Sequence, residues 1–448
     1  DSQNISDLTG IEDFIALAAL TCNDNQLTTL DLSNNTALSY LECWGNQLTT
    51  LDFSQNLLID YLYCQDNQLT SLDVSNNFAL ITLLCRNNQL TSLDVSQNFA
   101  LEYLNCYNNL LTSLDVSQNS ALITLYCEIN QLTSLDVSAN TVLIDMWCNT
   151  NQLTTLDVSN NTALTYLSCS DNQLTSLDVS NNFALITLYC YTNQLTSLNV
   201  NQNTSLTYLD CGGNQLTSLD VNQNTALIEL GCAANNISNL DITNNYYLEY
   251  INFWWNAVQS IDLSSNINLR HISCGGNWLY NLDLSNNINL EVLGCHNNPL
   301  QSLDLSNNIN LIDLYCYENT SLVTLDLSNN SMLKNIECEG NFLTYIDLRN
   351  GNNSLINSIT AQNNPNLNCI DVDDSLYCLN NWNTTNYQFD SHHYFSENCY
   401  VTTSIQEHTT NKELLKITDL LGRETKQTNQ ALFYIYDDGT VEKRIVIE

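Results

Sequence analysis

The sequence predicts an all-β solenoid of about 16–17 coils, followed by a small C-terminal β domain. The first observation is a fixed repeat, because cysteines recur every 21 residues from Cys22 to Cys232. Phe253 takes the next slot, and the period resumes at Cys274. A fixed period in this range is typical of a solenoid, in which each repeat buries its apolar face only against its neighbours.

The second observation is the pattern within each repeat. Two short runs alternate apolar with polar residues, as in Leu30–Leu32 and Leu41–Cys43, and each is followed by a turn that contains asparagine. This alternation predicts two short strands per coil. No stretch shows a ten-residue helical pattern, so we expect the repeats to be all-β.

The third observation is composition. The 448 residues include 48 acidic and 10 basic side chains, giving a net charge of −38, yet 44% of residues are apolar. That apolar content is enough for an extended core. Such an acidic surface repels phosphate groups, so we expect no nucleic-acid partner. No run of 18 apolar residues occurs, so no membrane insertion is expected. Because the chain starts at Asp1, we expect any leader to have been removed.

The core is predicted to consist of ladders of identical residues. The inward positions of one coil are Leu27, Leu30, Leu32, Ala37, Leu38, Leu41 and Cys43. Since Phe253 fills a cysteine slot, we expect the cysteines to be small core residues with reduced thiols. Asparagine stands three residues after every cysteine slot, from Asn25 to Asn364, where its amide can bond to neighbouring coils. Stacking at about 4.8 Å per coil predicts a rod of roughly 80 Å.

These residues carry a resemblance to a known family. The pattern L-x-x-L-x-C-x-x-N-x-L-x-x-L-D-L-x-x-N resembles the 21-residue bacterial leucine-rich repeats sometimes called IRREKO repeats, over about residues 5–364. The resemblance implies a leucine-rich-repeat solenoid in a surface or secreted binding protein. Residues 4–14 resemble the latter part of that family's N-terminal cap.

The resulting domain prediction has five parts. Residues 1–21 form a partial N-terminal cap, 22–364 the solenoid, 365–400 a C-terminal cap, 401–411 a linker and 412–448 a β domain. In the cap, Cys369–Cys399 is the preferred disulfide, although three single pairings with Cys378 exist. A zinc site at Cys378, His392, His393 and Cys399 is a weaker alternative, because the spacing matches no strong ligand motif.

The last part carries a second resemblance. Its alternating runs predict three strands. It resembles a short C-terminal sorting domain of type IX secretion substrates. The residues that carry the resemblance are Asp419-Leu420-Leu421-Gly422-Arg423 and Gly439-Thr440-Val441, followed by Lys443-Arg444-Ile445-Val446-Ile447. This resemblance implies export to the cell surface or the extracellular space.

An aspartate column is the first candidate site. The same outward slot holds Asp31, Asp52, Asp73, Asp94, Asp115, Asp136, Asp157 and Asp178, and the column continues in later coils. Carboxylates about 5 Å apart repel by roughly 1 kcal/mol in water. Three arrangements relieve this repulsion: raised pKa values, hydrogen bonds to neighbouring serine and threonine hydroxyls, or Ca²⁺ or another divalent cation that bridges neighbouring coils. Ca²⁺ is the only cofactor that the sequence suggests.

An aromatic face is the second candidate site. Three outward slots flank each cysteine slot, at minus three, minus one and plus one, and one third of them hold Tyr or Trp, against 9% aromatic residues in the whole chain. Such rings are typical of binding interfaces and of sugar-stacking sites. The predicted binding residues are Tyr40, Trp44, Tyr61, Tyr63, Tyr103, Tyr107, Tyr126, Trp147, Tyr166, Tyr189, Tyr191, Tyr208, Tyr250, Trp254, Tyr315 and Tyr317.

The sequence therefore predicts an exported binding or adhesion protein that recognises a protein or a polysaccharide through this face. The alternative is a structural subunit that assembles head-to-tail into a filament or surface layer, because an incompletely capped coil end exposes strand edges. No catalytic motif occurs among the residues, so an enzyme is not expected.

Overall fold

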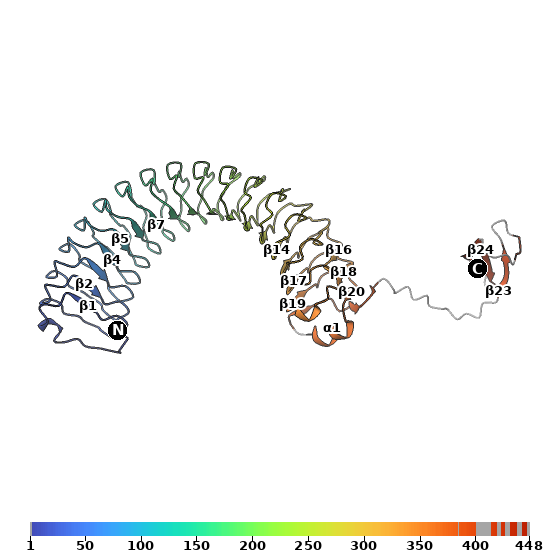
Figure 1. Ribbon diagram of the computed structural model, residues 1–448, viewed down its shortest axis with the longest axis horizontal. Coiled ribbons are helices and arrows are strands. Elements are labelled where there is room, and N and C mark those ends of the chain that lie inside the picture. Colours follow the sequence, from blue (N-terminus) through green and yellow to red (C-terminus); the bar gives the residue numbers. More distant parts are fainter. Residues whose placement is uncertain are drawn as a thin grey trace. The chain divides into compact units, whose positions relative to one another are not determined.

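The computed structural model describes residues 2–383, 385–399, 414–418, 423–425, 431–436 and 441–445. The chain divides into two compact units, Asp1–Glu397 and Asn398–Glu448. The first unit contains the solenoid (Figure 1). Within the described residues no helix is long and apolar enough to cross a membrane.

The solenoid is built on one long parallel sheet of 18 strands. From Ala19 to Tyr315 each coil contributes a short strand that pairs in register with the strand 21 residues later, as in Tyr40↔Tyr61, and the spacing of the last pairings lengthens, as in Asp313↔Asn335. The strands are β1 (Ala19–Thr21), β2 (Tyr40–Glu42), β3 (Tyr61–Tyr63), β4 (Thr82–Leu84), β5 (Tyr103–Asn105), β6 (Thr124–Tyr126), β7 (Asp145–Trp147), β8 (Tyr166–Ser168), β9 (Thr187–Tyr189), β10 (Tyr208–Asp210), β11 (Glu229–Gly231), β12 (Tyr250–Asn252), β13 (His271–Ser273), β14 (Val292–Gly294), β15 (Asp313–Tyr315), β17 (Asn335–Glu337), β19 (Ser358–Thr360) and β21 (Tyr387–Gln388).

The prediction of two strands per coil is wrong for most of the solenoid. A second parallel sheet forms only towards its end, from β16 (Thr324–Asp326), β18 (Tyr345–Leu348), β20 (Cys369–Val372) and β22 (Tyr394–Ser396). In the earlier coils that the structure describes, this side has only the isolated parallel bridge Asp73↔Asp94. The aspartate accepts a hydrogen bond from the backbone N–H two residues later both there, as at Asp31 (Ser33 N, 2.9 Å), and in β16 at Asp326 (Ser328 N, 3.0 Å), so this hydrogen bond does not decide where the second sheet forms.

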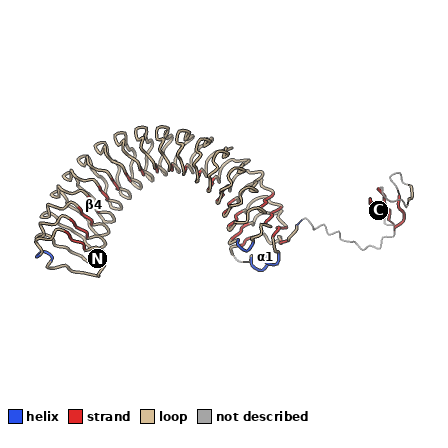
Figure 2. The backbone as a smooth tube through the Cα atoms, viewed as in Figure 1, coloured by secondary structure: helices blue, strands red, loops and turns tan. Residues whose placement is uncertain are grey.

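The coils of this unit follow a curve, which the sequence did not predict. The strands of the long sheet lie along its inner side, and turns and loops occupy the outer side (Figure 2). Strand pairing holds the inner side at the normal strand spacing of about 4.8 Å, whereas the outer side lacks such a ladder through most of its length. We call the solvent-facing side of the long sheet the concave face.

The predicted leucine and cysteine ladders form the core. Leu27, Leu38 and Leu41 have no exposed surface, and Phe253 is equally buried in its cysteine slot. Leu30 and Ala37 of the first coil are only half-buried. The cysteines of the ladder are free and buried, so the prediction of a Cys ladder inside an all-β solenoid is confirmed.

The asparagine column three residues after the cysteine slot ties the coils together. The Asn172 side chain accepts a hydrogen bond from Leu153 N at 2.9 Å and donates to Cys148 O and Cys169 O, each at 3.1 Å. Its amide therefore joins its own coil to the preceding one, and the same pattern repeats along the column.

A second asparagine column was not predicted to have a role. It includes Asn56, whose side chain has no exposed surface and donates to Leu32 O at 3.0 Å and to Asn35 O at 2.9 Å in the preceding coil. The invariance of Asn in the V-S-x-N turn of each repeat was the available signal. The solenoid thus has two internal asparagine ladders, one at each of two turns.

Short helices occur at both ends of this unit, namely η1 (Ile11–Asp13), η2 (Asn353–Leu355) and α1 (Ser375–Asn381). The Tyr377 N–H donates to Asp374 Oδ1 at the start of α1. Trp382, 5% exposed, stacks on Tyr387 with ring centroids 5.6 Å apart and contacts Phe395 edge-on at 5.5 Å. An aromatic cluster therefore covers the last coil, where the sequence predicted a cap.

The cysteines of the cap region differ in state. Cys369 and Cys399 are each disulfide-bonded, whereas Cys378 is a free thiol buried in α1. Among the described residues no group of three or more His, Cys, Asp or Glu side chains is arranged to hold a metal ion.

The second unit contains a small antiparallel sheet of three strands, β23 (Leu414–Thr418), β24 (Ala431–Tyr436) and β25 (Val441–Ile445). The small C-terminal β region of the predicted fold class is therefore present. The predicted linker at 401–411 lies outside the described residues.

Candidate binding face

The predicted aromatic residues all lie on or directly after the strands of the concave face. Every one is half-buried except Trp254, which is 38% exposed. Half-burial arises because leucine and cysteine between the outward slots anchor each strand in the core, as the burial pattern of β6 shows. The rings therefore lie against the sheet with one side available to a partner.

Five of these rings form a continuous run across neighbouring coils. Their centroid distances are 5.6 Å for Tyr103–Tyr126, 5.3 Å for Tyr126–Trp147, 5.2 Å for Trp147–Tyr166 and 5.8 Å for Tyr166–Tyr189. Trp147 and Tyr166 are stacked, and the others are tilted or edge-on, which are the favoured arrangements of aromatic pairs. We call these five residues the central run.

Small and acidic residues between the rings allow the rings of the central run to contact one another. Thr124 pairs with Tyr103 in the sheet, and its short side chain leaves room for the Tyr103 ring to reach the ring of Tyr126. Asp145 accepts hydrogen bonds from Tyr126 Oη at 2.5 Å and from Trp147 Nε1 at 2.9 Å. Its carboxylate therefore fixes two rings of the run.

Other predicted rings form smaller groups. Tyr40 contacts both Tyr61 and Tyr63, with centroids 6.0 and 5.6 Å apart. Trp254 contacts the neighbouring Trp255 at 5.8 Å. The remaining predicted residues, Trp44, Tyr107, Tyr191, Tyr208 and Tyr315, share the face without belonging to these groups.

Two histidines extend the aromatic face beyond the prediction. His271 stacks on Tyr250 at 4.5 Å, and His296 stacks on Tyr317 at 4.4 Å. Burial lowers the pKa of both imidazoles below the ordinary value of 6.5. Both histidines occupy outward slots that hold aromatic residues in other coils, and this position could have predicted their place in the aromatic face. At neutral pH they act as further flat, uncharged rings.

The concave face is acidic as well as aromatic. Arg86 is the only Lys or Arg in its outward slots, and it pairs with Asp66 at 3.4 Å. Glu128 lies beside the central run, is 8% exposed, and has its pKa raised by burial to about 7. A partner for this face must therefore tolerate, or neutralise, negative charge.

A hollow of about 310 Å³ opens on this face at the end of the central run, where Tyr189 belongs to both. It is lined by Tyr189, Tyr191, Tyr208, Leu209, Asp210, Glu229, Gly231, Tyr250 and Asn252. These residues come from β9–β12 and the positions next to them, so four successive coils contribute to it. We call it the tyrosine pocket.

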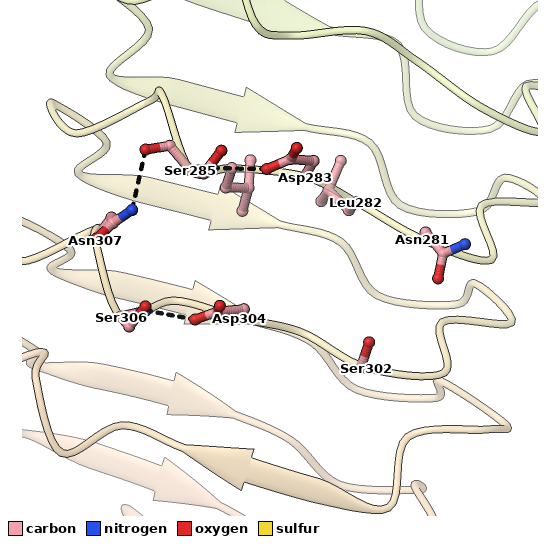
Figure 3. Close-up of a pocket in the computed structure, with 9 residues that line it drawn as sticks. Asn281, Leu282, Asp283, Ser285, Ser302, Asp304, Ser306 and Asn307 are labelled. Carbon is pink, nitrogen blue, oxygen red and sulfur yellow. Dashed lines mark hydrogen bonds between the residues drawn. The ribbon is translucent and has the colours of Figure 1, made fainter.

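The aspartate column lies on the solenoid outside the concave face, and its carboxylates bond locally. In each of the eight predicted coils the N–H and hydroxyl of the serine two residues later hold the aspartate pKa below its ordinary value of 3.8. Figure 3 shows the same arrangement later in the chain, where Asp283 and Asp304 each accept from a serine N–H at 3.0 Å.

Calcium binding by this column stays a prediction, and it has a direct test. If Ca²⁺ bridges neighbouring coils, replacing millimolar Ca²⁺ with EDTA restores repulsion between carboxylates and lowers the Tm by several degrees. If the serine hydrogen bonds alone stabilise the column, the Tm stays the same. Differential scanning calorimetry in the two buffers, with Mg²⁺ as a control for ionic strength, distinguishes the two cases.

Comparison with known proteins identifies the fold. The functional domain of InlJ from Listeria monocytogenes, described as including a cysteine ladder, is 29% identical with a TM-score of 0.64, covering 96% of this chain and 90% of that one. YopM from Yersinia enterocolitica is 23% identical with a TM-score of 0.67, covering 80% and 76%.

The leucine-rich-repeat ectodomain of the receptor kinase GASSHO1/SCHENGEN3 from Arabidopsis thaliana is 20% identical with a TM-score of 0.59, covering 81% of this chain and 57% of that one. No family model and no curated protein matches the chain. The in-register sheet, the internal ladders and these structural neighbours together show that residues of the first unit adopt the leucine-rich-repeat fold.

Proposed function

We propose that this chain is a binding module that recognises a protein partner through its concave face. The observation that carries the proposal is the central run, in which five half-buried rings form one continuous surface. Rigid Tyr and Trp side chains supply large contact area at a low entropic cost, which is why they dominate binding energy at protein interfaces.

Two further points support a protein partner at the cell surface. The Arabidopsis ectodomain was solved in complex with CASPARIAN STRIP INTEGRITY FACTOR 2, and a partner of this kind suits a long concave face. Residues 412–448 resemble the sorting domain of exported proteins, so we also propose that the partner is met outside the cell.

The test replaces three rings of the central run at once. The variant Tyr126→Ser, Trp147→Ser, Tyr166→Ser is expected to bind at least ten-fold more weakly than the parent, because buried aromatic anchors at interfaces contribute about 2 kcal/mol or more each. The ligands are peptides and proteins selected by phage display on the immobilised full chain, and affinity is measured by biolayer interferometry.

The control removes three exposed rings outside the concave face. Phe78, Phe99 and Phe183 lie in turns before their strands and are 54%, 52% and 56% exposed. Their replacement by serine is expected to leave binding unchanged, and both variants should keep the parent circular dichroism spectrum. Equal loss of binding in both variants would contradict the proposal. If phage display yields no ligand, and binding to a polysaccharide on a glycan array is lost in the central-run variant but kept in the control, the protein-partner proposal is overturned in favour of the glycan alternative.

A further inference from the structure

The tyrosine pocket differs from the rest of the concave face because a side chain is missing from one outward slot. Gly231 occupies the slot that holds Tyr126 or Tyr189 in other coils. A Cβ atom at Gly231 would lie 2.7 Å from Cγ and Oδ1 of Asp210, so any larger residue would displace that carboxylate. The glycine therefore keeps the pocket open and lets Asp210 lie across its floor.

The pocket contains two carboxylates without a counter-ion. Asp210 is half-buried, and its Oδ1 accepts a hydrogen bond from Gly212 N at 2.9 Å. Neither Asp210 nor Glu229 forms an ion pair with any residue that the structure describes. A half-buried carboxylate loses part of its hydration, and a cation placed beside it restores the lost stabilisation.

The walls of the pocket also favour a cation. Tyr189, Tyr191, Tyr208 and Tyr250 all line it, and the negative face of a tyrosine ring attracts ammonium and guanidinium groups. Rings together with carboxylates form a site for an organic cation with an apolar stem. The volume of about 310 Å³ lies at the lower end of the range of roughly 300–1,000 Å³ known for ligand pockets, which suits one long side chain.

We propose that the tyrosine pocket receives a basic side chain, arginine or lysine, presented by the protein partner. This inference rests on the proposed function and names the chemistry of the partner at one place on the concave face. The stem of the side chain lies against the tyrosine rings, and its charged end meets Asp210 and Glu229. With a net charge of −38, the chain also attracts a basic partner over a distance, which raises the association rate at low salt.

Two other occupants fit the pocket less well. A neutral sugar would stack on the rings but would leave both carboxylates without a counter-ion. A metal ion would find only two carboxylates, and no cluster of three or more such ligands exists among the described residues. A basic side chain satisfies the rings and the acids together.

The test uses two probes that differ only in charge. The tripeptide acetyl-Gly-Arg-Gly-amide is compared with the same peptide carrying citrulline, which is nearly isosteric with arginine but neutral. Binding to the full chain is followed by saturation-transfer NMR, since a single side chain gives a dissociation constant on the order of 1 mM. We expect the arginine peptide to bind at least ten-fold more tightly than the citrulline peptide, and less tightly as NaCl rises.

Variants locate the binding site. Asp210→Asn and Tyr208→Ala are each expected to weaken arginine binding at least five-fold, and Gly231→Ala to do the same by displacing the Asp210 carboxylate into the pocket. The matched control is Glu318→Gln with Tyr280→Ala, an exposed acid and an exposed tyrosine that neither line the pocket nor belong to the predicted binding residues. It should leave arginine binding unchanged.

The outcomes separate this inference from the proposed function. Equal binding of the two peptides, no binding of the arginine peptide, or equal loss in the control variant would overturn the basic-side-chain proposal. Binding of chitotriose that depends on Tyr208 but not on Asp210 would also overturn it in favour of neutral stacking. The central-run variant tests the proposed function alone, because none of its three substituted residues lines the pocket.

Discussion

Raising the pH above about 9 is expected to unfold the solenoid over a narrow interval. The fifteen cysteines of the ladder are free and buried, and burial raises the pKa of the Cys169 thiol from an ordinary value of 9.0 to about 12. Burial also raises the pKa of the other thiols, as at Cys148 and Cys190, whose pKa lies well above 9.0. In the unfolded chain these thiols ionise near pH 9, whereas in the folded chain burial keeps them protonated to higher pH.

The sign and the size of this pH effect on the free energy of unfolding follow from proton linkage. Because the folded pKa is raised, the ladder stabilises the fold fully below pH 9, and this contribution is lost as the pH rises towards the folded pKa values. Each thiol costs up to about 1.4 kcal/mol of unfolding free energy per pH unit. If five coils unfold together, the slope is about 7 kcal/mol per pH unit, against a typical total stability of roughly 5–15 kcal/mol.

Far-UV circular dichroism against pH measures this transition, and pulsed alkylation by iodoacetamide, counted by mass spectrometry, shows whether the cysteines ionise with it. The two signals should change together, because thiolates form mainly in the unfolded chain. Replacing Cys148, Cys169 and Cys190 by alanine should lower the number of protons released on unfolding by about three at pH 10 or higher. Replacing the exposed Thr154, Thr175 and Thr196 by alanine should not change it. Alkylation of the ladder cysteines near pH 9 without loss of structure would contradict a ladder closed to solvent.

The sequence predicts the parts of this molecule that depend on the repeat. The sequence predicts the period, the core columns and the Asn column because stacked coils place equivalent residues in contact. Each repeat therefore needs the same residue types at these positions as its neighbours. The positions of the aromatic slots follow from the same register, and the structure finds those residues on the concave face.

What the sequence did not predict depends on contacts between particular neighbours. The Tyr103–Tyr126 contact requires a short Thr124 beside Tyr103, and the tyrosine pocket requires Gly231 beneath Asp210. Such features depend on which residues occupy neighbouring slots of adjacent coils. They are not visible when a single slot is followed along the repeats. The second strand per coil was predicted from alternation alone, which does not show whether neighbouring backbones pair. The Asp31–Ser33 hydrogen bond does not explain its absence, because Asp326 accepts the same bond within β16.

Replacing Asn172 by alanine is expected to lower the free energy of unfolding by about 2–3 kcal/mol. The substitution leaves the Leu153 N–H without the Asn172 Oδ1 acceptor at 2.9 Å, and Leu153 is fully buried. A buried backbone donor without a partner costs about 1–3 kcal/mol. The carbonyls of Cys148 and Cys169 lose one donor each but keep a second, from Asn151 and Asn193. The unpaired N–H therefore dominates the cost.

Urea denaturation gives the stability, and hydrogen exchange with mass spectrometry gives the location. In Asn172→Ala the Leu153 amide should lose protection, whereas amides several coils away should keep theirs, because contacts in a solenoid extend only between neighbours. The adjacent Gln173 is exposed, so Gln173→Ala is the matched control and should change stability by less than about 0.5 kcal/mol. If both substitutions cost the same, or if Leu153 remains protected, the asparagine column does not hold the coils together through this hydrogen bond. Local loss of protection would instead show that each asparagine secures one junction between coils, so that the stability of the concave face depends on the whole column.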